Sequence, residues 1–192
     1  MPRIETETLA QHRDWSRSQL IDAAAAIALE SGGAAITVAA VAQRAGLSRT
    51  SVYEYFGSSS ELVADLVIDE LKNFAQVLTE SVAQCQGGRN CTECWIEAAL
   101  TYIADGRHLL AKALNATALP QSRSQQIASA HRALMAPLIK GFEQMGVKDL
   151  QQAMTFVQAV TDAATKRIEA GHDAETEIRS ATAFCINGLA SI

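Results

Sequence analysis

The stretch that decides the fold is Thr37-Val-Ala-Ala-Val-Ala-Gln-Arg-Ala-Gly-Leu-Ser-Arg-Thr-Ser-Val-Tyr-Glu-Tyr-Phe56. It predicts two short helices, because Thr37 and Ser48 are good N-cap residues and Gly46 permits a sharp turn between them. Apolar side chains recur at helical spacing and are expected to lock the two helices together. The stretch therefore predicts a helix-turn-helix. The apolar residues concerned are Val38, Val41, Ala42, Leu47, Val52 and Phe56.

The side chains left over on the second helix are expected to face outward from this support. A DNA major groove admits one α-helix, and the N-terminal side chains of that helix meet the base edges. The pattern is therefore typical of a DNA-reading helix. The outward set consists of Arg49, Thr50, Ser51, Tyr53 and Tyr55.

The sequence on both sides predicts more helices. An alanine-rich apolar stripe favours a first helix over residues 15–31, ended by Gly32-Gly33, and a long periodic helix is expected from about residue 60 to about residue 84. Alanine makes up about a sixth of the 192 residues, against three prolines, so the chain is predicted to be all-α with about nine helices. The later helices are expected at 91–105, 107–116, 122–144, 148–170 and 173–191, with a loop over 85–90 and a kink at Pro137.

Composition excludes several classes of protein. Hydrophobic residues make up 48% and charged residues 19%, which is too apolar for a disordered chain. No apolar run approaches the ~20 residues of a membrane span, and Met1–Glu5 does not begin a signal peptide, so no membrane partner and a cytoplasmic location are expected. No phosphate-binding loop, HExxH motif, nucleophile elbow or carboxylate pair is present, so we expect no enzyme and no cofactor.

The charge of the chain does not favour binding to DNA. The net charge is −5, and the first sixty residues hold five basic against six acidic side chains. Binding to DNA would therefore have to depend on helix termini and hydroxyl groups more than on bulk charge.

Residues 15–66 resemble the DNA-binding domain of the TetR family of bacterial transcriptional regulators. The resemblance lies in the first helix ending at Gly32, in Ala45-Gly46-Leu47-Ser48, in Val52-Tyr53-Glu54-Tyr55-Phe56-Gly57-Ser58 and in Glu61-Leu62. It implies a helix-turn-helix DNA-binding domain over residues 1–59 and a helical effector-binding and dimerisation domain over residues 60–192.

By this resemblance, Arg49, Thr50 and Ser51 would lie nearest base edges, Tyr53 and Tyr55 would hold phosphates, and Thr37 would meet the DNA backbone. The family often carries a lysine at the position of Ser59, where it grips a phosphate. Ser59 can still donate a hydrogen bond there, so we expect a shallow dependence of DNA binding on salt.

The resemblance also implies a small-molecule effector and a homodimer. An effector pocket is expected between the helices of residues 60–145, and Pro137 could open it. Candidate pocket residues are Trp95, Tyr102, His108, His131, Met135 and Phe142, with His131 on the apolar face of its helix. The last two helices carry broad bands of small apolar residues suited to an antiparallel four-helix bundle with a second copy. The candidate dimer residues are Met154, Val157, Thr161, Ala164, Ala181, Cys185 and Gly188.

Three cysteines fall close together: Cys85, Cys91 and Cys94. The Cys91-x-x-Cys94 spacing with Cys85 nearby leaves open a thiol redox sensor, a metal site or simple free thiols. Four ligands of a zinc site are not at hand, so no metal is expected, and Cys185 is assigned to core packing.

The sequence therefore predicts a DNA-binding transcriptional regulator, a repressor that binds a palindromic operator as a dimer and is released by an effector. The alternative is a ligand-binding or redox-sensing helical protein of the same fold whose DNA binding is weak or lost.

Overall fold

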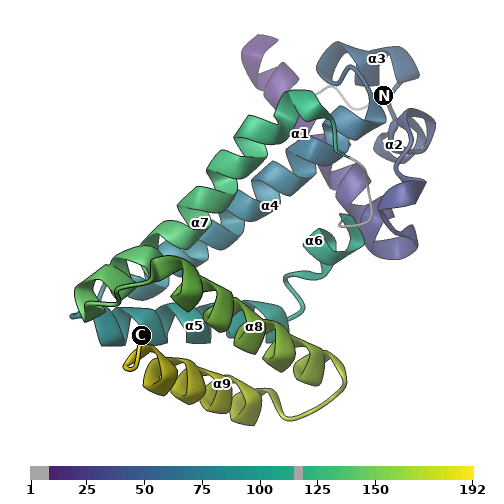
Figure 1. Ribbon diagram of the computed structural model, residues 1–192. Helices are drawn as coiled ribbons and strands as arrows, with labels where there is room; N and C mark the ends of the chain where they lie inside the picture. The colour runs from purple at the N-terminus through teal and green to yellow at the C-terminus, as the bar shows by residue number, and fades with distance from the viewer. Residues whose placement is uncertain (1–8, 115–118) are drawn as a thin grey trace. The chain divides into compact units, whose positions relative to one another are not determined.

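A computed structural model describes residues 9–114 and 119–192 (Figure 1). Within these ranges every regular element is helical, which confirms the all-α prediction. None of the described helices is long and apolar enough to cross a membrane. The elements are α1 Leu9–Ser31, η1 Gly33–Ala35, α2 Val38–Ala45, α3 Arg49–Tyr55, α4 Ser59–Val82, α5 Gly88–Ala104, α6 Leu109–Leu114, η2 Gln121–Arg123, α7 Ser124–Met145, α8 Leu150–Glu169 and α9 Ala174–Leu189.

The chain forms two compact units. The first contains the residues up to Glu70 together with Leu110–Ile127, and the second contains Leu71–Leu109 and Ala128–Ile192. Long helices α4 and α7 each contribute residues to both. The units do not follow the expected boundary at residue 60, because Leu62, Val63 and Leu66 of α4 are buried in the core of the first unit.

The core of the first unit is built around α1. Its alanine-rich face is buried at Leu20, Ala24 and Ala28, and Val41 and Val52 pack into the same cluster. The helix begins at Leu9 instead of residue 15, since no proline or glycine interrupts the six residues before Trp15.

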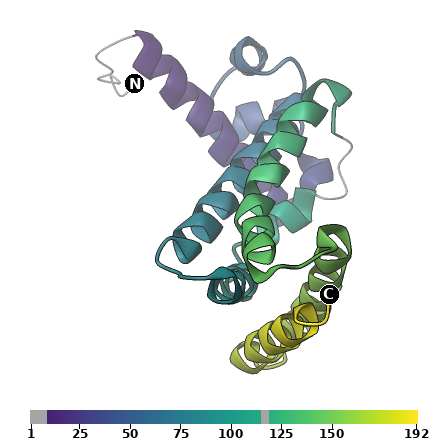
Figure 2. The same cartoon turned by 60° about the vertical axis from the view of Figure 1, so that its left-hand side comes forward.

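The core of the second unit is built from buried residues of α5, α7, α8 and α9, and α5, α8 and α9 contact one another. Figures 1 and 2 show α8 (green) and α9 (yellow) side by side. Helix α5 begins at Gly88, inside the expected loop over 85–90, and it approaches α7 closely. A Cβ at Gly88 would lie 2.5 Å from the Gly141 carbonyl oxygen, so only glycine fits this contact.

The other helices follow the sequence prediction with shifts at their ends. Helix α7 continues through Pro137, and α8 and α9 are capped by Asp149 and Asp173, whose carboxylates accept from the amides of Gln152 and Thr176. Helix α6 starts at Leu109, two residues later than expected, and the end of its predicted range lies outside the described residues, as does the N-terminal segment.

Candidate nucleic-acid interface

The turn between α2 and α3 has the geometry that the sequence predicts. The Thr37 hydroxyl oxygen accepts from the Ala40 amide at 3.1 Å, and the Ser48 hydroxyl oxygen accepts from the Ser51 amide at 3.0 Å. Gly46 ends α2 in the left-handed conformation, with φ of 68°. Both N-caps and the glycine turn are therefore confirmed, and they set the angle at which α3 leaves α2.

Helix α3 presents one exposed face over a buried anchor. Val52 is fully buried, whereas Arg49, Thr50 and Tyr53 are exposed, with 58% of Tyr53 accessible. A helix that enters a major groove needs exposed side chains on one face while its opposite face is packed into a core. Helix α3 has this arrangement. Thr37, at the start of α2, is also exposed.

Two residues of the predicted outward set lie differently. Tyr55 is half-buried and packs against the core of the first unit, and Ser51 is half-buried with its hydroxyl 2.9 Å from that of Ser48. The reason is helical periodicity: Tyr55 lies three residues after Val52 and one before Phe56, both of which are buried. The fully outward face is therefore narrower than expected.

Much of the positive charge in this unit is neutralised internally. Arg44 forms a two-pronged pair with Glu30, at 2.5 and 2.6 Å, and these bonds raise the pKa of Arg44 and lower that of Glu30. In the described part of α1 to α3, no ion pair engages Arg49, whose guanidinium is exposed.

A second set of charges lies at Asp65 of α4, whose side chain is only 11% exposed. Its carboxylate accepts from Arg17 of α1 at 2.6 Å and from Arg123 of η2. The Arg17 guanidinium also lies over the Phe56 ring, 5.6 Å from the ring centroid, so it contacts the residue that caps the end of α3. These contacts stabilise the first unit, and the arginines that form them are not available to bind a phosphate.

The start of α4 carries its own negative charge. The Ser58 hydroxyl accepts from the Glu61 amide at 3.2 Å, and the Glu61 carboxylate accepts from the Gly57 amide at 3.0 Å. This capping arrangement occupies backbone donors that could otherwise meet a phosphate. Ser59, the first residue of α4, is half-buried beside it.

The residues predicted to line an effector pocket are mostly packed into the core of the second unit. Trp95 is buried and donates from Nε1 to the Leu134 carbonyl at 3.3 Å, and Phe142 is fully buried. Tyr102 is buried and stacked on Phe74, with ring centroids 4.3 Å apart. Met135 is partly buried against the same core.

The two histidines of the predicted pocket lie in different environments. His131 is exposed, so its assignment to the apolar face of its helix was wrong: the buried face of α7 runs through Ala130, Leu134 and Leu138. His108 is half-buried, its Nε2 lies 2.9 Å from the Glu169 carboxylate, and its buried Nδ1 has no hydrogen-bond partner among the described residues.

Three cavities of the second unit can be described, and none is lined by any of the six predicted pocket residues. One of about 890 Å³ lies between the start of α5 and the ends of α7 and α9. One of about 410 Å³ lies on α8 and α9, beside Phe156 and Phe184. One of about 580 Å³, the Pro137 cavity, lies among the end of α4, the start of α5 and α7.

The predicted dimer residues differ in how far they are buried. Val157, Ala164, Ala181 and Cys185 are buried within the second unit, so their small side chains serve the packing of α8 against α9. Met154 and Thr161 are half-buried, and Gly188 is exposed. The accessible apolar side chains on these two helices are instead Phe156 and Phe184, at 52% and 70% exposure.

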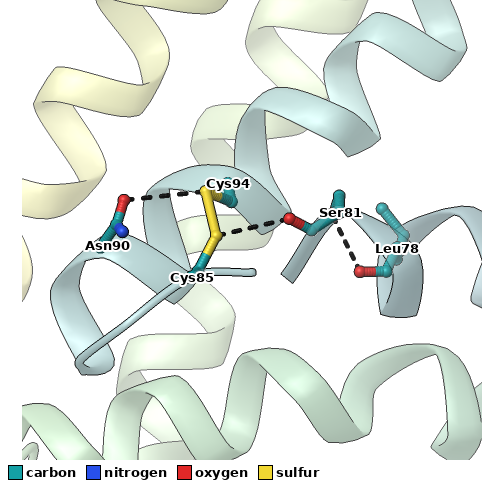
Figure 3. Close-up of a disulfide and its surroundings, with 5 residues drawn as sticks. All are labelled: Leu78, Ser81, Cys85, Asn90 and Cys94. Carbon is teal, nitrogen blue, oxygen red and sulfur yellow. Dashed lines mark hydrogen bonds between the residues drawn. A yellow bond between two sulfur atoms is a disulfide. The ribbon is translucent and has the colours of Figure 1, made fainter. Parts of the chain in front are cut away.

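Cys85, in the turn after α4, forms a disulfide with Cys94 of α5 (Figure 3). The spacing of the three cysteines left their state open, and in the structure Cys91 keeps a free, half-buried thiol. Burial raises the pKa of the Cys185 thiol to about 11, which agrees with its assignment to the core. Among the described side chains, no group of three or more histidine, cysteine or acidic residues could hold a metal ion.

Comparison with known proteins bears on the same region. Residues 20–66, about a quarter of the chain, match the family model of bacterial regulatory proteins of the tetR family. This match begins in α1 and ends in α4, so it contains α2, α3 and the turn between them. A comparison with curated proteins finds no match.

Solved structures with the same fold cover most of the chain at low identity. A putative transcriptional regulator from Pseudomonas aeruginosa is 17% identical with a TM-score of 0.78, over 93% of this chain and 91% of that one. FadR from Bacillus subtilis, a transcriptional regulator solved in complex with stearoyl-CoA, is 18% identical with a TM-score of 0.73, over 89% and 98%. The helix-turn-helix of this chain lies within residues 20–66, the segment that matches the family model of bacterial regulatory proteins of the tetR family.

Proposed function

We propose that this chain is a transcriptional repressor that binds a palindromic operator as a homodimer and is released by a small-molecule effector. One observation carries the DNA-binding part: α3 exposes Arg49, Thr50 and Tyr53 over the buried Val52, directly after a capped glycine turn. Arg49 has no ion pair within the described residues, and an arginine at a helix N-terminus is the side chain most suited to guanine.

The dimer is supported by the exposed aromatic side chains of α8 and α9. Phe156 and Phe184 border an apolar hollow of about 410 Å³ that also includes Val160 and Gly188. Two copies joined through this face would bury both phenylalanines, and a two-fold axis would present two α3 helices to a palindrome. Phe184→Glu is expected to give a monomer in light scattering, whereas Gln151→Glu, on the exposed side of α8, is not.

The effector site is proposed at the Pro137 cavity of about 580 Å³. Proline has no amide proton, so the Ala133 carbonyl lacks its helix partner, and both residues line this cavity. An effector releases DNA only if it binds the DNA-incompetent state more tightly than the competent one. Helix α4 starts four residues after α3 ends and reaches this cavity at Thr79 and Val82, so one helix belongs to both sites.

Selection of binding sequences from random duplex DNA tests the proposal directly. The expected result is a palindrome with half-sites about one helical turn apart, protected as a unit in footprinting next to the chain's own gene. Enrichment of no sequence by a folded, dimeric protein would contradict it and would favour the alternative of a sensor that has lost DNA binding.

A further inference from the structure

We propose that Cys85 and Cys94 are a reversible thiol–disulfide pair, and that the Pro137 cavity admits a small anionic thiol that opens the bond. This names a ligand class for the effector site, and its regulatory step rests on the proposed function. The chemistry of the pair can be tested without DNA.

The first observation is that each sulfur already faces an acceptor for a thiol proton. Cys85 Sγ lies 3.4 Å from the Ser81 carbonyl oxygen, and Cys94 Sγ lies 3.7 Å from the Asn90 Oδ1 (Figure 3). A sulfur in a disulfide carries no proton, so only the two thiols of the reduced pair can donate to these oxygens. Ser81 lies in the last turn of α4, where carbonyls lack intrahelical amide partners, so reduction supplies a donor that the helix end needs. The same backbone therefore accommodates the reduced pair.

The second observation concerns which of the two cysteines lies beside the cavity. Cys85 is half-buried and lines the Pro137 cavity, whereas Cys94 is not among the residues that line it. We therefore expect a thiol that enters this cavity to attack Cys85 before Cys94. Lys140, which is exposed, is the one charged residue among those lining the cavity, so the lining favours a thiol that carries a carboxylate.

The reaction balances without any redox cofactor. A thiolate attacks Cys85 Sγ, the bond to Cys94 breaks, and Cys94 leaves as a thiolate that takes up a proton. A second small thiol then attacks the mixed disulfide, which frees the Cys85 thiol and releases the small-molecule disulfide. Two small thiols are oxidised for each protein disulfide reduced, and the reverse exchange with the small disulfide restores the bond.

A regulator that binds an operator works in the compartment that holds the DNA. In a compartment that keeps thiols reduced, protein disulfides are usually transient and serve catalysis or redox sensing. The pair closes a short loop between the end of α4 and the first turns of α5, and opening it frees that loop next to the cavity. DNA affinity is therefore expected to differ between the oxidised and the reduced protein.

The test is to equilibrate the folded full-length protein in mixtures of reduced and oxidised glutathione, then alkylate and map the cysteines by mass spectrometry. We expect alkylation of Cys91 alone in the oxidised form, and of Cys85, Cys91 and Cys94 in the reduced form. Cys185 is buried and is the internal standard that stays unlabelled until the protein unfolds. A bond that resists thiol until unfolding, a bond that includes Cys91, or no bond in oxidised glutathione would each overturn the proposal.

Two variants test the named contacts. Asn90→Ala removes one acceptor of the reduced pair and is expected to shift the equilibrium toward the disulfide roughly twofold to tenfold. Lys140→Gln is expected to slow reduction by glutathione up to about fivefold while leaving reduction by uncharged mercaptoethanol unchanged. Equal slowing with both thiols, or no shift with Asn90→Ala, counts against the roles assigned to these residues.

Measurements of DNA affinity separate this inference from the proposed function. Cys85→Ser and Cys94→Ser cannot form the bond and are expected to show one DNA affinity in all glutathione mixtures, whereas the parent protein shows two. A pair that cycles in a protein that binds no DNA refutes the proposed function alone. A pair that cycles while DNA affinity stays constant refutes the regulatory step alone.

Discussion

The Glu61 carboxylate accepts a hydrogen bond from the Gly57 amide at 3.0 Å, and it thereby places a negative charge at the N-terminus of α4. A helix N-terminus is ordinarily an attractive site for a phosphate, through its free amides and its dipole. In this chain a carboxylate occupies that position, and Ser59 supplies only a hydroxyl. Contact with the DNA backbone at this point is therefore expected to be weak.

The first prediction follows from this contact. Ser59→Lys is expected to tighten binding to all DNA sequences alike and to steepen the log–log salt dependence by about one unit per protomer. The matched control is Ser59→Gln, which adds length without charge. The parent protein should show a shallow dependence, since Arg17 and Arg44 are engaged in ion pairs. A parent slope steeper than roughly −8 per dimer, or equal slopes for the two variants, would contradict this account.

The second prediction concerns Arg49, the unpaired arginine that begins α3. Arg49→Ala is expected to weaken specific binding by ~1–3 kcal/mol and to relax the base preference at one position of each half-site. Arg89→Ala removes the same charge from an exposed position of α5 and should leave binding unchanged. Fluorescence anisotropy with the selected palindrome and with one-base variants measures both effects. A uniform loss over all sequences would instead place Arg49 on a phosphate.

The third prediction is about stability. Asp65→Asn leaves Arg17 and Arg123 without their carboxylate, and it is expected to lower the free energy of unfolding by about 1.5–3 kcal/mol. Glu30→Gln breaks the exposed pair with Arg44 and should leave the unfolding midpoint within experimental scatter. Urea denaturation of both variants at neutral pH makes the comparison, and similar losses for the two would show that burial of Asp65 is unimportant.

The fourth prediction is a loss of stability at alkaline pH. Burial raises the pKa of Cys185 to about 11, above the ordinary value of 9.0, so the folded state holds the thiol proton more tightly than the unfolded chain does. The stabilisation of the folded state that comes from this raised pKa is fully present below about pH 9 and is lost as the pH rises toward 11. Between pH 8 and pH 10 the parent protein should lose more stability than Cys185→Ala. Equal losses would mean that this thiol is not buried in solution.

Local signals explain how much of the site could be predicted from the sequence. Thr37, Gly46 and Ser48 act on backbone groups only a few residues away, so their residue types alone indicate where α2 ends and α3 begins. The exposure of Arg49 and Tyr53 follows from the same local pattern, because Val52 between them has to be buried.

Other features depend on contacts between segments far apart in the chain. His131 is exposed because neighbouring helices cover the face of α7 that carries Ala130, Leu134 and Leu138. The band of small residues on α8 and α9 contains both buried and exposed positions, and spacing alone cannot separate them.

The sequence by itself determined the all-α class and the caps and turn of the helix-turn-helix, since these depend on short-range backbone chemistry and helical period. Only the tertiary structure decided that Cys85 bonds to Cys94 instead of Cys91, and that the first unit includes Leu62 to Leu66 of α4. Those outcomes depend on which surfaces meet in space, and a one-dimensional pattern does not contain that information.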